Sequence, residues 1–74
     1  MPDLRWKFGH AVRAARVSRE LSQEQLAHAA GLDRTYVSSL ERGLRNPTLT
    51  TQARLAQALG TPLHELIREA ERDG

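Results

Sequence analysis

The 74-residue sequence contains no cysteine and only one residue each of tryptophan, tyrosine and phenylalanine. The absence of cysteine excludes disulfide bonds and thiolate metal sites, and it fits a reducing compartment. No apolar run approaches the roughly 18 residues needed to cross a membrane. The first residues also lack the apolar core of a signal peptide. We therefore expect a single small domain over residues 1–74, located in the cytoplasm and without a membrane partner.

The sequence also lacks the patterns that metal binding and catalysis require. His10, His28 and His64 stand far apart and without the spacing of metal ligands. There is no nucleophile–base arrangement and no glycine-rich phosphate loop, and a chain of this size has little room for an active-site pocket. We expect no metal, no cofactor, no small-molecule ligand and no enzyme activity.

Charge is nearly balanced, with eleven basic and nine acidic residues and a net charge of +2. The placement of the charges is more informative than their sum. Basic residues gather in the first quarter and the middle of the chain, whereas acidic residues crowd its end. A basic body favours a polyanionic partner, although a solvated surface has the same composition. The basic residues concerned are Arg5, Lys7, Arg13, Arg16, Arg19, Arg34, Arg42 and Arg45.

No segment alternates apolar and polar residues long enough to indicate a strand, and the apolar spacing is helical throughout. Residues typical of helix starts and helix ends predict helices over about 4–19, 23–30, 34–42, 49–59 and 62–71. Ser22 and Gln25 form a capping box before the second helix, and Gly31 ends it. The Asp33 carboxylate is expected to cap the third helix and Thr48 the fourth. The sequence therefore predicts an all-α fold.

Apolar residues at helical spacing predict the buried stripe of each helix. The first helix should turn Leu4, Phe8, Val12 and Ala15 inward. The fourth should bury Leu49, Leu55, Ala56 and Leu59.

The second and third helices are joined by only three residues, Gly31, Leu32 and Asp33. A connection this short holds two helices at a steep angle. The small residues Ala27 and Ala30 permit the second and third helices to cross closely. The third helix then packs under the second, and the first turn of the third helix faces outward. Residues 23–42 are therefore interpreted as a helix-turn-helix unit.

An ordered set of motifs resembles the Cro/C1-type (XRE-like) helix-turn-helix family over roughly residues 8–67. The motifs are SQEQLA at 22–27, AGL at 30–32, YVSSLERG at 36–43, RNPTL at 45–49, LAQALG at 55–60 and LHELI at 63–67. Gln52 departs from the pattern, because the family often has an apolar residue there. The DRTY segment at 33–36 and the length are similar to the controller proteins of restriction-modification systems.

The resemblance implies a compact five-helix bundle of the lambda-repressor-like type that binds double-stranded DNA as a homodimer. The third helix would enter the major groove, which is about 12 Å wide and admits one helix. The positions that match base-contacting residues of the family are Arg34, Thr35, Ser38, Ser39 and Arg42.

Other matched positions imply contacts to the DNA backbone and one structural ion pair. Gln23, Arg45, Asn46 and Thr48 match phosphate-contacting positions, and exposed amides at a helix start favour an anion beside Gln23. Tyr36 lies in the first turn of the third helix, so its hydroxyl is also expected to reach phosphate. Arg16 and Glu41 match a partly buried ion pair that links the first helix to the third.

The last helix is the candidate dimer interface, because so small a core cannot bury all of its apolar residues. We expect Leu66 to point inward, and Ile67, with Leu63 or Ala70 beside it, to reach the partner. A two-fold dimer demands an inverted-repeat operator.

The sequence thus predicts a sequence-specific DNA-binding transcriptional regulator, with a restriction-modification controller as the favoured kind. An antitoxin or a phage-type repressor of the same fold is the first alternative. A protein-interaction module without DNA binding is the second, and Arg34 and Arg42 argue against it.

Overall fold

The computed structural model describes residues 3–72, and it contains five α-helices and no strand within that range. The all-α prediction is confirmed, and each helix begins and ends within one residue of its expected position. No helix in the described range has the length and apolar character needed to cross a membrane. The helices are α1 (Leu4–Ser18), α2 (Gln23–Ala30), α3 (Arg34–Glu41), α4 (Leu49–Leu59) and α5 (Leu63–Arg72).

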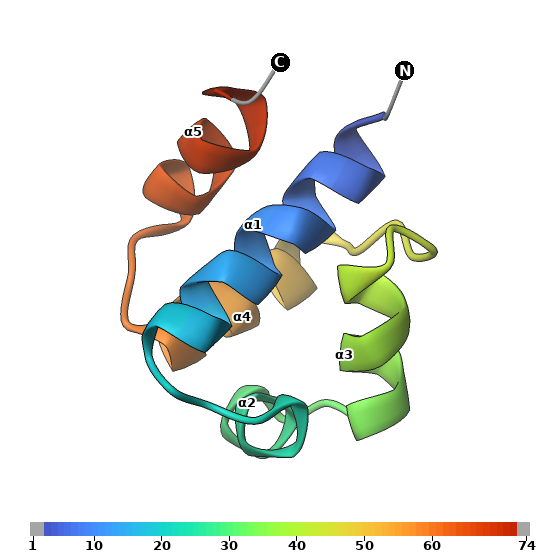
Figure 1. Ribbon diagram of the computed structural model, residues 1–74, viewed down its shortest axis with the longest axis vertical. Helices are drawn as coiled ribbons and strands as arrows, with labels where there is room; N and C mark the ends of the chain where they lie inside the picture. The colour runs from blue at the N-terminus through green and yellow to red at the C-terminus, as the bar shows by residue number, and fades with distance from the viewer. Residues whose placement is uncertain (1–2, 73–74) are drawn as a thin grey trace.

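Helix α1 forms the centre of the bundle and contacts α3, α4 and α5 (Figure 1). Helix α5 lies beside α1, and α4 passes behind it. Helices α2 and α3 form the opposite end of the molecule, where α2 is seen end-on. The pair α2–α3 is therefore held by α1 and α4 while α3 keeps one side free.

Local hydrogen bonds set most helix ends. The Ser22 hydroxyl accepts a bond from the Gln25 amide at 3.0 Å, and the Gln25 side-chain oxygen accepts one from the Ser22 amide at 2.8 Å. Gly31 ends α2 with a left-handed φ of 70°, which glycine adopts without steric cost. Asp33 precedes α3 as expected, but its carboxylate makes no capping bond, so that part of the prediction is wrong. Its carbonyl oxygen accepts from the Val37 amide instead.

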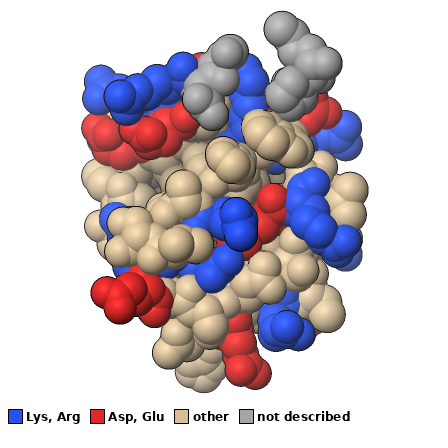
Figure 2. Space-filling view, viewed as in Figure 1, with Lys and Arg blue, Asp and Glu red and all other residues tan. Residues whose placement is uncertain are grey.

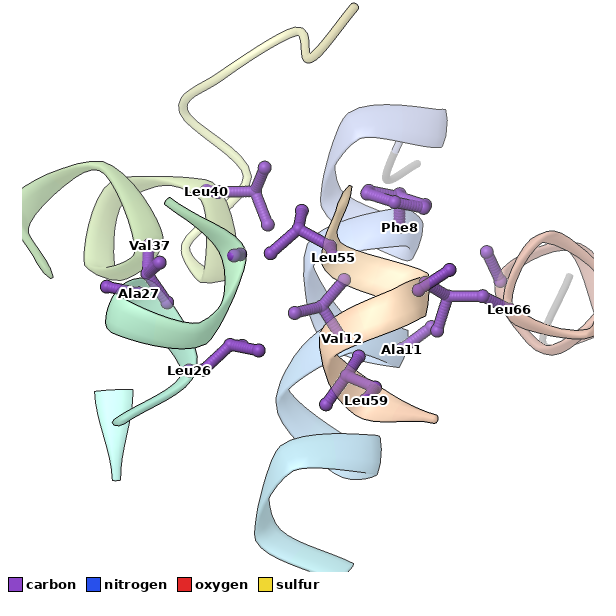
Figure 3. Packing of buried hydrophobic residues seen from close by; sticks show 13 residues of the cluster. Phe8, Ala11, Val12, Leu26, Ala27, Val37, Leu40, Leu55, Leu59 and Leu66 are labelled. Atoms are coloured by element: carbon purple, nitrogen blue, oxygen red, sulfur yellow. The ribbon is translucent and has the colours of Figure 1, made fainter. Parts of the chain in front are cut away.

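The core joins residues from all five helices (Figure 3). Val12, Leu26, Val37 and Leu55 have no solvent exposure, and each buried side chain of this size contributes roughly 1.5–3 kcal/mol. The other fully buried large side chains are Leu40 and Leu59.

Two of the predicted inward positions are wrong. Leu4 is 54% exposed and Leu49 is 71% exposed. Each is the first residue of its helix and lies beyond the reach of the core, although it has the right spacing. Gln52, the departure from the family pattern, is half-buried, and its amide nitrogen donates to the Pro47 carbonyl oxygen at 3.1 Å. A polar side chain is thereby accommodated at the α3–α4 loop.

Gly9 lies where α1 packs tightly against the end of α3. A Cβ atom at this position would overlap the carbonyl oxygen of Leu40, which is backbone and has little freedom to move. Gly9 itself is buried. The absence of a side chain at Gly9 therefore sets the spacing between α1 and the end of α3.

Candidate nucleic-acid interface

The helix-turn-helix unit consists of α2, the turn at residues 31–33, and α3. Ala27 and Ala30 are buried where the two helices meet, and Val37 packs against them from α3. The Leu32 amide donates to the Ala27 carbonyl oxygen at 2.8 Å, which closes the turn. These contacts orient α3 so that one of its faces points away from the core.

Four of the predicted base-contacting residues share that outward face of α3. Arg34, Thr35 and Arg42 are exposed, and Ser38 is half-buried between them. Positions 34, 38 and 42 follow one another at four-residue spacing, which keeps them on one side of a helix. Arg42 also donates from Nε to the Ser38 carbonyl oxygen at 3.4 Å. Figure 2 shows basic side chains along the side that α3 occupies, whereas basic and acidic groups mix over α5.

Ser39, the fifth predicted base contact, does not belong to this outward face. It is 8% exposed, and its hydroxyl donates to the Tyr36 carbonyl oxygen at 2.9 Å. The Ser39 hydroxyl oxygen in turn accepts a hydrogen bond from Arg45 Nε at 2.9 Å. The physical reason is that successive residues of a helix lie about 100° apart around its axis, so Ser39 points to a different side of α3 from its neighbour Ser38.

Arg45 lies against α3 although it belongs to the loop that follows this helix. Its guanidinium carbon lies 5.3 Å from the centre of the Tyr36 ring, a cation–π distance. Together with the Ser39 bond, this contact holds the arginine in place, and its two terminal nitrogens make no hydrogen bond within residues 3–72, so they can donate to an external acceptor. Sequence reasoning missed this arrangement, because the chain has to reverse direction between residues 39 and 45 for it to form.

The start of α2 provides the opposite edge of the surface. Gln23 is the first residue of α2, and its amide nitrogen donates to Glu41 Oε1 at 3.1 Å. The backbone amides of Gln23 and Glu24 make no bond to other residues in the range 3–72. Open amides at a helix start are suited to an anion.

Arg16 and Glu41 form a bidentate ion pair between α1 and α3. Arg16 Nε donates to Glu41 Oε2 at 2.7 Å, and Nη2 donates to Oε1 at 3.0 Å. Their side chains are only 11% and 2% exposed. The hydrogen bond to Glu41 raises the pKa of Arg16 further above its already high ordinary value, although burial opposes this. The third guanidinium nitrogen donates to the Leu21 carbonyl oxygen, just before α2.

Asn46 and Thr48 are exposed in the loop between α3 and α4. The Thr48 hydroxyl accepts from the Thr51 amide at 3.2 Å and donates to the Thr51 hydroxyl at 3.1 Å. Thr48 therefore acts as the expected cap of α4, and its own hydroxyl proton is engaged there. The loop has an open helix start for a phosphate rather than a free threonine hydroxyl.

The α5 residues divide between core and surface. Leu66 is 3% exposed, as expected, while Leu63 and Ile67 are half-buried and border a shallow groove along α5. Ala70 is 1% exposed in the single chain, so its assignment to a dimer interface is wrong. Ala70 follows Leu66 by four residues and hence shares its inward face.

Histidine and acidic side chains do not form a metal cluster in the part of the chain that the structure describes. The outward face of α3 is flanked by Gln23 on one side and Arg45 on the other.

Comparison with known proteins identifies relatives along nearly the whole chain. The helix-turn-helix family matches residues 12–66. The control protein C.MunI of a Mycoplasma species is 38% identical over 74 residues, which cover 99% of this chain and 100% of that protein. The control protein C.SmaI of Serratia marcescens is 46% identical over 65 residues, which cover 88% of this chain and 77% of that protein.

The fold is likewise similar to solved structures. The restriction-modification controller protein C.AhdI from Aeromonas hydrophila superposes with a TM-score of 0.81 and 48% identity, over 82% of this chain and 92% of that one. The clp gene regulator ClgR from C. glutamicum superposes with a TM-score of 0.94 and 30% identity, over 99% of this chain and 95% of that one.

Proposed function

This chain belongs to the Cro/C1-type helix-turn-helix family of DNA-binding transcription regulators, and we propose that it is the controller protein of a restriction-modification system. In this proposal it binds an inverted-repeat operator as a homodimer in the cytoplasm. It performs no catalysis and needs no cofactor or small-molecule ligand.

The observation that carries the DNA-binding proposal is the outward face of α3, where Arg34, Thr35, Ser38 and Arg42 line up without entering the core. Arginine donates two hydrogen bonds to the O6 and N7 atoms of guanine, and threonine contacts a thymine methyl or a base edge. In this arrangement α3 occupies the major groove. Arg34 and Thr35 then meet base edges from the first turn of α3, and Arg42 follows at its end.

Phosphate contacts on both sides of the groove would set the register of α3. Gln23 and the open amides of α2 serve one strand, and the loop with Asn46 and Thr48 serves the other. We assign Arg45 to phosphate as well, because its terminal nitrogens stay free above Tyr36. The Tyr36 hydroxyl is assigned to the same strand as Arg45.

The controller assignment is favoured over a phage-type repressor by sequence identity. The chain is 46% identical to control protein C.SmaI and 48% identical to controller protein C.AhdI, but 34% identical to the phage CTXphi repressor RstR and 39% identical to the immunity repressor of Bacillus phage phi105. An antitoxin of the same fold would be encoded beside a toxin. A controller would be encoded beside an endonuclease and a methyltransferase.

Dimerisation is assigned to Leu63 and Ile67, whose side chains remain partly exposed on α5. The groove that they border is lined otherwise by His64, Arg68, Glu71 and Arg72. An apolar centre with a charged rim is the usual composition of a protein interface. A second copy would cover the apolar centre and place two α3 helices on one side of the duplex.

Footprinting on the DNA upstream of the chain's own gene tests the function. We expect protection of two half-sites about one helical turn apart. A duplex of random sequence bound as tightly as this DNA would refute sequence-specific regulation. Failure to bind any duplex at low salt would instead support the protein-interaction module.

A further inference from the structure

Glu41 receives hydrogen bonds from two different helices at a single carboxylate oxygen. Oε1 accepts from Arg16 Nη2 at 3.0 Å and from Gln23 Nε2 at 3.1 Å. Its other oxygen accepts from Arg16 Nε at 2.7 Å. The end of α3, the start of α2 and α1 therefore meet at one buried group.

We propose that Glu41, held by Arg16, is a positioning residue for the contact of Gln23 with a DNA phosphate. This inference rests on the proposed function, which assigns that contact to Gln23. The Gln23 amide nitrogen carries two protons. One is used by Glu41, and the other makes no bond within residues 3–72, so it is left for an external acceptor.

The bond to Glu41 fixes which way the Gln23 amide faces. A free glutamine samples many rotamers, and it presents its oxygen to a phosphate as readily as its nitrogen. Phosphate accepts hydrogen bonds but donates none to such a group. The Glu41 carboxylate also only accepts hydrogen bonds, so it binds the amide nitrogen of Gln23 rather than the amide oxygen. The Gln23 side chain is thereby held in one orientation. The entropy of ordering this side chain is thus lost on folding rather than on DNA binding.

Arg16 makes this arrangement compatible with DNA. An unneutralised carboxylate beside a phosphate ligand would repel the polyanion, since the local dielectric is low. The bidentate pairing with Arg16 compensates the charge of Glu41. The geometry therefore assigns this ion pair a second task besides joining α1 to α3, and it couples one phosphate contact to the helix that reads the bases.

A double-mutant cycle on DNA affinity isolates the coupling, because the general electrostatic effect of each change cancels. The probe is a 30-base-pair duplex of random sequence, since a phosphate contact does not depend on sequence. In the wild-type background, Gln23→Ala should weaken binding about tenfold, as expected for one hydrogen bond to a charged acceptor. In the Glu41→Met background, which offers no side-chain oxygen to Gln23, the same change should weaken binding about twofold or less.

Glu24→Gln is the matched control. It removes the same charge one residue from Gln23, but the Glu24 side chain is exposed and makes no hydrogen bond or ion pair with Gln23 or Arg16 within residues 3–72. In this background Gln23→Ala should keep its tenfold effect. An equal loss on Gln23→Ala in the Glu41→Met background would overturn the positioning role. A wild-type protein that binds no duplex would overturn the proposed function itself.

A second background protects the experiment against unfolding. Replacing both partners, Arg16→Met with Glu41→Met, removes the ion pair without leaving a buried charge, and such replacements are often neutral for stability. This double variant also lacks the acceptor for Gln23. Gln23→Ala should have little effect on its DNA affinity, and a persistent tenfold loss there would again contradict the proposal.

Discussion

The guanidinium of Arg45 lies over the ring of Tyr36, with 5.3 Å between its central carbon and the ring centre. The loop after α3 is thereby folded back on the helix that it follows. Because the loop contacts α3 through Arg45, we expect a substitution in the loop or on the outward face of α3 to act on DNA binding.

Arg45→Ala should weaken binding to every duplex by a similar factor. One fewer phosphate contact releases one fewer counterion, so the slope of log affinity against log salt should flatten by about one. Titrations at several salt concentrations measure this. Arg13→Ala is the control, because Arg13 is an exposed arginine on α1 that we assign to neither the DNA surface nor the dimer interface. A loss confined to one operator sequence would reassign Arg45 to base contact.

Arg34→Ala should cost about 1–3 kcal/mol on the cognate operator and relax the preference at one base pair. Arg34 is exposed at the first position of α3, so folding should be unaffected. Binding to a panel of single-base operator variants measures the change in preference. An equal loss on random and cognate DNA would make Arg34 a backbone contact.

Glu41→Ala should lower the free energy of unfolding by roughly 3–5 kcal/mol, because it leaves the Arg16 charge buried without its partner. Thermal and urea unfolding measure this. Glu65→Ala is a suitable control, since the ion pair of Glu65 with Arg68 lies at the surface and contributes little. An unchanged melting temperature would show that water reaches Arg16 and solvates it.

Ile67→Glu should produce a folded monomer with greatly reduced operator binding. A charge in a desolvated contact disfavours association by several kcal/mol. Sedimentation and circular dichroism report association and folding separately. Ala70→Glu should instead unfold the chain, since Ala70 is 1% exposed. If Ile67→Glu dimerised as tightly as wild type, the interface would lie elsewhere.

Asp3 should titrate below its ordinary pKa of 3.8, because Arg5 and the Trp6 amide donate hydrogen bonds to its carboxylate. A lowered folded-state pKa means that the cap of α1 stabilises the fold above about pH 3.8 and is lost as the pH falls through the folded value. An NMR titration of Asp3 measures this. Arg5→Ala should raise the pKa, and an unchanged value would mean that the Arg5 contact is absent in solution.

Helix ends were predictable because their causes are local. Ser22 and Gln25 are three residues apart, and Gly31 needs only its own backbone freedom to end α2. Burial was less predictable at the edges of the core. Leu49 has the spacing of an inward residue but begins its helix outside the contact area.

The residues of the candidate site could be predicted from the sequence better than the directions in which their side chains point. Family resemblance assigned Ser38 and Ser39 the same role, yet only three-dimensional packing separates them, with Ser39 turned toward Tyr36 and Arg45. The bond between Gln23 and Glu41 spans 18 residues and depends on how α2 crosses α3. No local pattern encodes such a distance.

The missing side chain at Gly9 has a consequence for how such a protein changes its target over time. Arg34, Thr35 and Arg42, which we propose to contact the bases, are exposed. They can therefore be exchanged without disturbing the core. Gly9 has no such freedom, because a Cβ atom there would overlap the carbonyl oxygen of Leu40 near the end of α3. New operator preferences should therefore arise by substitutions on the outward face of α3, while position 9 remains glycine and keeps α3 in place against α1.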